Sequence, residues 1–109
     1  MSFNIELITQ EMIGAARDTV QERWPQIETM AEVELRRLAG SMEDLGRLVA
    51  EGKIDVSRAR QHAHIHQITA RSVLATTEGL GLRTADQAVT AAIRAVTKLV
   101  NGALKFALL

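Results

Sequence analysis

Residues 55–109 read DVSRARQHAHIHQITARSVLATTEGLGLRTADQAVTAAIRAVTKLVNGALKFALL. In the first half of this stretch, small or apolar residues recur three or four positions apart, as they do along one side of a helix. These residues are Val56, Ala59, Ala63, Ala70, Val73 and Leu80, and His66 and Thr77 fill the remaining positions of the same seam. Asp55 can accept hydrogen bonds from the first free backbone N–H groups of a helix. We therefore predict a helix over about residues 55–79, ended by Gly79 and Gly81.

A second helix is predicted over about residues 84–107. Thr84 and Gln87 have the spacing of a capping box, in which each side chain accepts a hydrogen bond from the other residue's backbone N–H. The apolar residues of this helix form a broad arc made of Val89, Ala92, Ile93, Val96, Leu99, Val100, Ala103, Leu104 and Ala107. So wide an arc exceeds what one neighbouring helix covers. We expect this helix to contact at least two others, from its own chain or from another copy.

Composition indicates one domain, residues 1–109, with an aliphatic core. Hydrophobic residues make up 47% of the chain and aromatic residues only 3%. Because the chain has no cysteine, it forms no disulfide and no thiolate metal site, which favours a reducing compartment. Residues 1–10 lack the basic and then apolar pattern of a signal peptide, and no apolar run is long enough to span a membrane. We expect a cytoplasmic location.

The formal charge is zero overall but is unevenly distributed along the chain. Residues 1–52 hold ten acidic and five basic residues, residues 53–82 hold two and four, and residues 83–109 hold one and four. Packing of the acidic half on the basic half would bring opposite charges together, within one chain or between subunits. The basic residues do not gather in one stripe interleaved with aromatics, so we do not expect nucleic acid as a partner.

The first half is helical in pattern from Phe3 to Ala50, with one interruption at Pro25. Pro25 either begins a new helix or kinks one long helix. A new helix would give four segments and an up-down bundle, whereas a kink would leave an arm that needs a partner chain. The four segments would be about residues 3–22, 26–50, 55–79 and 84–107. We favour the kink, because the preceding Gln-Glu-Arg-Trp lacks the residues that make tight turns.

Gly52 is expected to end the second helical segment in the usual C-cap role. The connection from there to Asp55 is short, and short connections make consecutive helices antiparallel. Residue numbers that sum to about 106 should therefore lie at similar heights in the two helices. This rule places His62 near Glu43 and Asp44.

The histidines cluster at positions 62, 64 and 66, on the third predicted helix. His62 and His66 are four residues apart and share a helix face, so two imidazoles could bind one divalent metal ion, zinc or iron. Glu43 or Asp44 could supply the carboxylate of such a site. The more ordinary interpretation is that His66 fills a seam position while His62 and His64 are solvated.

Glu28, Glu32 and Glu34 invite comparison with carboxylate-rich bundles that bind two irons. The chain has no Glu-x-x-His motif, which is central to those sites. We therefore expect these acids on a solvated or salt-bridged face. The sequence also lacks a nucleophile elbow and a phosphate-binding glycine-rich loop, so we do not expect an enzyme and expect no cofactor.

Taken together, the patterns predict an all-α antiparallel bundle with a helix hairpin after Pro25, completed by homo-oligomerisation and acting as a structural or protein-interaction subunit. The predicted interface residues are Trp24, Val96, Leu99, Val100, Ala103, Leu104 and Phe106. One alternative is the metal-binding bundle with His62 and His66. The other is attachment of the last helix to a membrane surface, since Arg94, Lys98 and Lys105 lie opposite its apolar arc.

Overall fold

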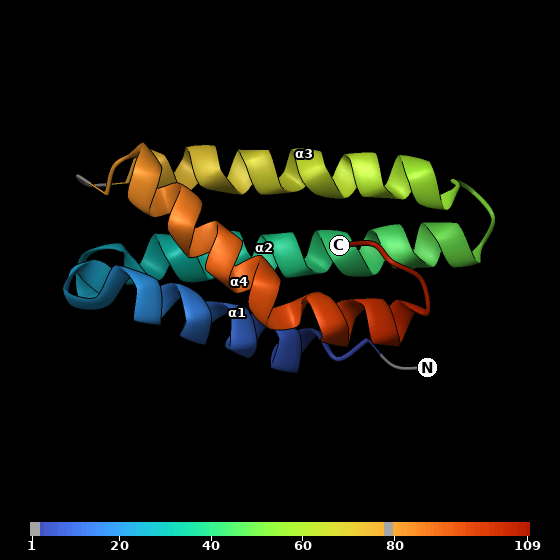
Figure 1. The fold of residues 1–109 in the computed structure, drawn as a ribbon, viewed down its shortest axis with the longest axis horizontal. Coiled ribbons are helices and arrows are strands. Elements are labelled where there is room, and N and C mark those ends of the chain that lie inside the picture. The colour runs from blue at the N-terminus through green and yellow to red at the C-terminus, as the bar shows by residue number, and fades with distance from the viewer. Residues whose placement is uncertain (1–2, 78–79) are drawn as a thin grey trace.

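The chain folds into α-helices joined by short connections, as the computed structural model of residues 3–77 and 80–109 shows (Figure 1). The helices are α1 (Ile5–Val20), α2 (Trp24–Ala50), α3 (Val56–Ala75) and α4 (Leu82–Leu104), with a 3-10 turn at Gln21–Arg23 between α1 and α2. No strand occurs in these described residues. The all-α prediction and the packing of the helices as a bundle are thus confirmed. None of the described helices is both long and apolar enough to cross a membrane.

Each of these helices packs mainly against two others. α1 packs against α2 and α4, and α3 packs against the same two helices. α1 and α3 therefore occupy diagonally opposite corners of the bundle, and Figure 1 shows them along opposite edges of the molecule. α4 crosses diagonally from the end of α3 to the beginning of α1 (Figure 1).

The break between α1 and α2 is where the kink prediction is wrong. α1 ends at Val20, Gln21 takes a positive φ of 57°, and α2 begins at Trp24 with Pro25 in its first turn. The chain reverses direction there, so α2 runs back alongside α1 (Figure 1). A positive φ outside glycine costs about 1–3 kcal/mol. Burial of Val20 and Trp24 on either side of the turn offsets this cost.

Two helix ends behave as their residues predict. The Asp55 carboxylate accepts a hydrogen bond from Arg58 N at 2.7 Å and caps the start of α3. Gly52 follows α2 with a φ of +72°, and the next backbone N–H, that of Lys53, donates to Leu48 O at 2.9 Å. Only glycine takes this left-handed conformation without strain, so Gly52 ends α2 and lets the chain turn toward α3.

The connection between α3 and α4 differs from its prediction. α3 ends at Ala75, earlier than expected, and Gly79 lies outside the described residues. Gly81 has a φ of +82° but serves as the N-cap of α4, which begins at Leu82. Thr84 therefore lies inside the helix, and the predicted capping box does not form.

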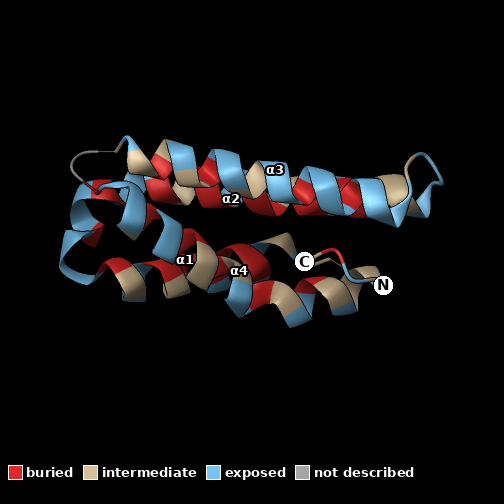
Figure 2. Ribbon diagram, turned by 45° about the horizontal axis from the view of Figure 1, so that its top comes forward, coloured by how far each residue is buried: buried red, intermediate tan, exposed pale blue. Residues whose placement is uncertain are grey.

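The core is aliphatic and runs the length of the bundle. Figure 2 shows the buried residues on the sides of the helices that face one another. The largest fully buried side chains are Met12, Ile27, Leu35, Leu38, Met42, Leu74, Val89, Val96, Val100 and Thr9. On α3 the buried positions are mostly alanines, namely Ala59, Ala63 and Ala70, with Leu74. α1 and α3 of the same chain cover part of the broad apolar arc of α4, including Val89, Val96 and Val100, whereas Leu99 is 42% exposed.

The residues after α4 fold back onto the bundle. Asn101 Oδ1 accepts hydrogen bonds from Leu108 N at 2.9 Å and from Leu109 N at 3.0 Å, and Asn101 Nδ2 donates to Leu109 O at 3.3 Å. These bonds hold Leu108 in the core, where its side chain is 2% exposed. One side chain thus secures the whole last turn of the chain.

Candidate functional site

The histidines and the acids that the sequence grouped with them lie along the packed pair of α2 and α3. His66 is half-buried between these helices. Burial lowers the pKa of His66 because it penalises the charged imidazolium, and Arg37 and His62 lower it further by repulsion. Asp44 acts in the opposite direction. The His66 imidazole therefore has Arg37, His62 and Asp44 as its charged or titratable neighbours, where α2 and α3 meet.

The lowered pKa of His66 predicts that the fold loses stability as the solution is acidified. An unperturbed imidazole has a pKa of about 6.5, so below that pH the unfolded chain binds a proton at His66 more readily than the folded chain does. The stabilising contribution of neutral His66 is complete above about pH 6.5 and decreases as the pH falls toward the lower folded pKa. Urea unfolding at about pH 7.5 and about pH 5 measures the decline.

The matched controls for this pH effect are two substitutions on α3. His66→Gln should reduce the decline in unfolding free energy, whereas His64→Gln, at an exposed position, should leave it unchanged. An equal decline in the two variants would contradict a role for His66.

The structure does not bring the predicted metal ligands together. Within residues 3–77 and 80–109, no three histidine, aspartate or glutamate side chains form a group that could hold a metal ion. Asp44 pairs with Arg47 at 3.1 Å on its own helix, and the Arg37 guanidinium near His66 would repel a bound cation. A zinc or iron site at His62 and His66 with Glu43 or Asp44 stays a prediction.

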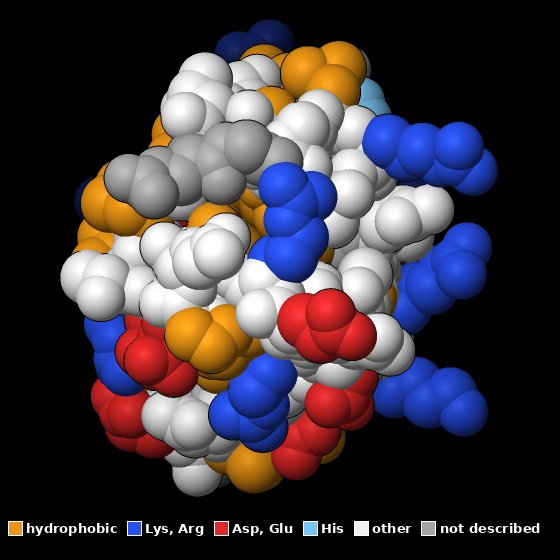
Figure 3. Space-filling model, turned by 90° about the vertical axis from the view of Figure 1, so that its left-hand side faces the viewer, with side chains coloured by type: hydrophobic (Ala, Val, Ile, Leu, Met, Phe, Trp, Pro, Cys, Tyr) orange, Lys and Arg blue, Asp and Glu red, His pale blue; other side chains and the backbone are white. Residues whose placement is uncertain are grey.

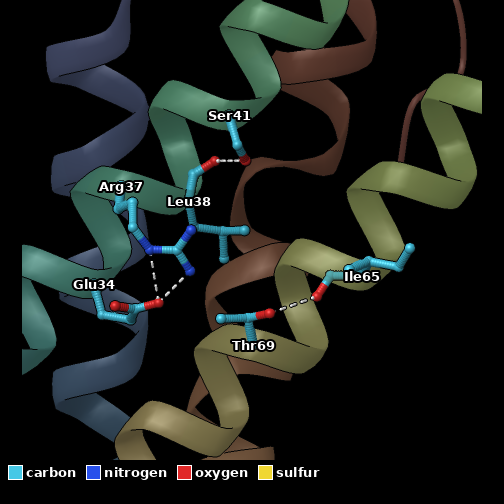
Figure 4. Close-up of polar contacts among 6 residues, drawn as sticks. All are labelled: Glu34, Arg37, Leu38, Ser41, Ile65 and Thr69. Carbon is cyan, nitrogen blue, oxygen red and sulfur yellow. Dashed lines mark hydrogen bonds and ion pairs between the residues drawn. The ribbon is translucent and has the colours of Figure 1, made fainter.

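Two glutamates of α2, Glu34 and Glu28, have partners within their own helix. Glu34 is 5% exposed and accepts a hydrogen bond from Arg37 Nε at 3.0 Å, and Arg37 Nη2 also donates to it (Figure 4). Glu28 accepts a hydrogen bond from Trp24 Nε1 at 3.0 Å. The arginine satisfies the buried carboxylate, so Glu34 is part of a salt bridge, as its ordinary interpretation requires.

Neighbouring hydroxyls in the same region bond to their own helices. In Figure 4, Ser41 donates to Leu38 O on α2, and Thr69 donates to Ile65 O on α3. Side chains bonded to the preceding helical turn are held in place. The polar groups that this view labels on α2 and α3 thus act within their own helices.

The residues predicted to form a subunit interface divide into covered and uncovered ones. Trp24, Val96 and Val100 are buried by the single chain, at 5%, 0% and 0% exposed. Ala103, Leu104 and Phe106 are half-buried. Leu99 is 42% exposed. One copy therefore already covers most of these side chains, and their part in an interface stays a prediction.

Burial of the apolar side of α4 also affects whether this helix could attach to a membrane surface. Arg94, Lys98 and Lys105 are exposed, as the prediction requires, but the apolar side of α4 packs against α1 and α3. An interfacial helix needs its apolar side free to enter the lipid. Attachment through α4 would require the bundle to open.

α3 has an exposed surface that is not among the sites predicted from the sequence. We define the α3 outer face as Arg58, Gln61, Ile65, Ile68 and Ser72, which are spaced three or four residues apart and are all exposed. Ile65 is 56% exposed and Ile68 is 48% exposed, and Leu82 at the start of α4 is 77% exposed. The missed signal was two isoleucines on the side of the helix opposite its alanine seam.

A groove lies beside this face, between α3 and the beginning of α4. Its volume is about 440 Å³, and it is lined by Ile68, Arg71, Ser72, Leu82, Arg83 and Asp86. Arg71 crosses from α3 to α4, where Arg71 Nε lies 2.7 Å from Asp86 Oδ1 and Arg71 Nη2 donates to Thr90 Oγ1 at 3.3 Å. An ion pair therefore joins the two helices that line the groove, while the two large apolar side chains of its lining, Ile68 and Leu82, are exposed.

The end of the molecule that contains the turn between α1 and α2 also contains the connection from α3 to α4 (Figure 1). In Figure 3 hydrophobic side chains reach this surface in small separate groups, with charged side chains between them. The exposed Ile65 and Ile68 lie along the length of α3.

Comparison of the chain with protein-family models, with curated proteins and with solved structures finds no match to any of them. A proposal for its function therefore rests on the geometry of its own surfaces.

Proposed function

We propose that this protein is a helical interaction subunit that associates with itself and has a structural rather than a catalytic role. The observation that carries the proposal is the exposure of Ile65, Ile68 and Leu82 beside one another on α3 and α4. Covering apolar surface contributes about 25 cal/mol per Å² removed from water. Clustered apolar side chains on a surface mark a site of interaction more often than scattered ones do.

The polar groups of the bundle support a structural role. Glu34 is bonded to Arg37, Glu28 to Trp24, and Asp44 to Arg47 within α2. Each of these pairs lies within one helix, and the bond to Glu28 satisfies the indole N–H of the buried Trp24. The ion pair of Arg71 with Asp86 joins α3 to α4. Such contacts fix the shape of the bundle and thereby the surface that α3 presents.

Light scattering during size-exclusion chromatography tests the proposal. The wild-type chain at micromolar concentration is expected to show a mass above that of the monomer. Ile68→Asp places a charge among the exposed apolar side chains and should weaken association about tenfold or more. Thr29→Asp adds the same charge at an exposed position of α2 and serves as the control. A wild-type protein that remains monomeric at all accessible concentrations would contradict self-association.

A further inference from the structure

The α3 outer face has the spacing of a coiled-coil seam. Its members are spaced alternately three and four residues apart, which places them one above another along the helix. They are Arg58, Gln61, Ile65, Ile68 and Ser72, and all five are exposed (Figure 2). The buried alanines of α3 lie on the opposite side of the helix. In a coiled coil such a seam packs against the matching seam of another helix, so a second molecule is needed to cover this one.

The seam has the same order of polar and apolar residues when it is read in either direction. Ile65 and Ile68 form its centre, with Gln61 before them and Ser72 after them, at spacings of four, three and four. In an antiparallel pair centred between the two isoleucines, each Ile65 meets Ile68 of the second copy, and each Gln61 meets Ser72. Apolar side chains therefore meet apolar ones, and polar side chains meet polar ones. A second copy of this chain fits the face in that orientation.

Charge favours the antiparallel orientation over the parallel one. Two α3 outer faces in parallel register would set each Arg58 opposite Arg58 of the other copy, and like charges that face one another disfavour an interface. In the antiparallel register, each Arg58 lies opposite Ala75 instead. The two Arg58 residues are then about 25 Å apart along the pair, at 1.5 Å per residue. Arg71, beside the seam, is already paired with Asp86 of its own chain.

The groove between α3 and α4 adjoins the same contact. In the antiparallel register, the part of α3 that lines the groove, from Ile68 to Ser72, faces residues 61–65 of the second copy. Leu82, which is 77% exposed, lines the α4 side of the groove and adds apolar surface next to the seam. Because both copies present a groove in the same relation to α3, the pair contains this contact twice.

We propose that two copies form a closed dimer in which their α3 outer faces pack antiparallel, related by a two-fold axis at the level between Ile65 and Ile68; this inference rests on the self-association proposed above. A two-fold contact uses the same surface on both copies, so no α3 outer face remains free for a third copy. In analytical ultracentrifugation, the mean mass should rise with protein concentration and level off at twice the 11.9 kDa of one chain. A mass that passes this limit would contradict a closed pair.

Disulfide cross-linking tests the orientation, because the natural chain has no cysteine. A chain that carries both Gln61→Cys and Ser72→Cys should give a covalent dimer in oxidised glutathione, since each new thiol faces the other position of the second copy. Within one chain these positions are eleven residues apart along α3, about 16 Å, which is too far for a disulfide. Non-reducing gel electrophoresis measures the dimer, and mass spectrometry of its peptides identifies the bridge.

The single variants are the matched controls. Two copies of Gln61→Cys, or two of Ser72→Cys, would hold their thiols about 16 Å apart along an antiparallel pair and should stay without a bridge. A parallel pair would instead bring identical positions together and cross-link the single variants. Thr29→Cys, at an exposed position of α2, measures cross-linking by random collision. Far-UV circular dichroism verifies that every variant keeps the helical fold.

The other outcomes separate the orientation from self-association itself. If the wild-type chain associates but the double variant cross-links no faster than Thr29→Cys, copies join through another surface and the α3 pairing is wrong. If a single variant cross-links as fast as the double variant, the antiparallel register is wrong. If the wild-type chain is monomeric at all accessible concentrations, self-association fails, and the pairing fails with it.

Discussion

Replacing Trp24 by alanine is expected to lower the free energy of unfolding by about 3–5 kcal/mol, the range measured for loss of a large buried aromatic side chain. Trp24 is 5% exposed and begins α2, directly after the turn at Gln21–Arg23. Its ring packs into the core, and its Nε1 donates to Glu28. Truncation therefore leaves a cavity at the point where α1 and α2 are joined. Urea unfolding followed by far-UV circular dichroism measures the loss.

Two variants separate the sources of this loss. Glu28→Ala removes only the acceptor of the Trp24 hydrogen bond and should cost about 0.5–1.5 kcal/mol. Trp24→Phe keeps an aromatic ring in the core and should lose less than Trp24→Ala. Because the side chain is covered by its own chain, the loss should not depend on protein concentration. A loss that shrinks on dilution would instead assign Trp24 to a contact between copies.

The turn before Trp24 shows where sequence patterns are insufficient. The apolar period of residues 3–50 continues across Pro25, so it is compatible with one kinked helix as well as with two helices. Whether the chain forms one kinked helix or two helices depends on Gln21, which adopts a positive φ although glutamine has no special preference for it. Tertiary burial of the neighbouring Val20 and Trp24 decides this conformation, and no local pattern reports it.

Helix ends were predictable where one residue determines them. Asp55 and Gly52 were identified because an acceptor side chain and a left-handed glycine are specific local devices. The start of α4 was misplaced because Thr84 and Gln87 also suit the interior of a helix, while the glycine at position 81 could cap either neighbour.

The candidate surfaces were harder to predict than the fold. Periodicity identifies the side of a helix that is buried, but it does not say which residues of that side reach a neighbour and which reach solvent. Val96 and Leu99 belong to one predicted arc, yet the structure buries the first and leaves the second 42% exposed. The diagonal course of α4 over α1 causes this difference, and its course follows from packing across the whole bundle (Figure 1).

Gly46→Leu is expected to destabilise the bundle by about 1–3 kcal/mol, because the new side chain must displace that of Leu104 from its packed position. A Cβ atom at Gly46 would overlap Leu104 Cδ2 and would lie 3.2 Å from Leu104 Cγ. Gly46 is buried in the interior of α2, where glycine costs about 1 kcal/mol relative to alanine. That intrinsic cost is offset here because its absent side chain lets the end of α4 approach α2. Urea unfolding of the variant measures the effect.

The same substitution at Gly102 is the matched control, since a Cβ there meets nothing within 4 Å. Gly102→Leu should leave the stability unchanged or raise it by up to about 1 kcal/mol through helix propensity. Combining Gly46→Leu with Leu104→Ala should restore part of the lost stability, because the new side chain takes the space that Leu104 vacates. A coupling of about 0.5–3 kcal/mol in this double-mutant cycle would place the two residues in direct contact. Equal stability of the two glycine variants would mean that α4 does not pack closely on α2 at this point. The hydrogen bonds from Leu108 N and Leu109 N to Asn101 Oδ1 would then be the stronger constraint on the end of α4.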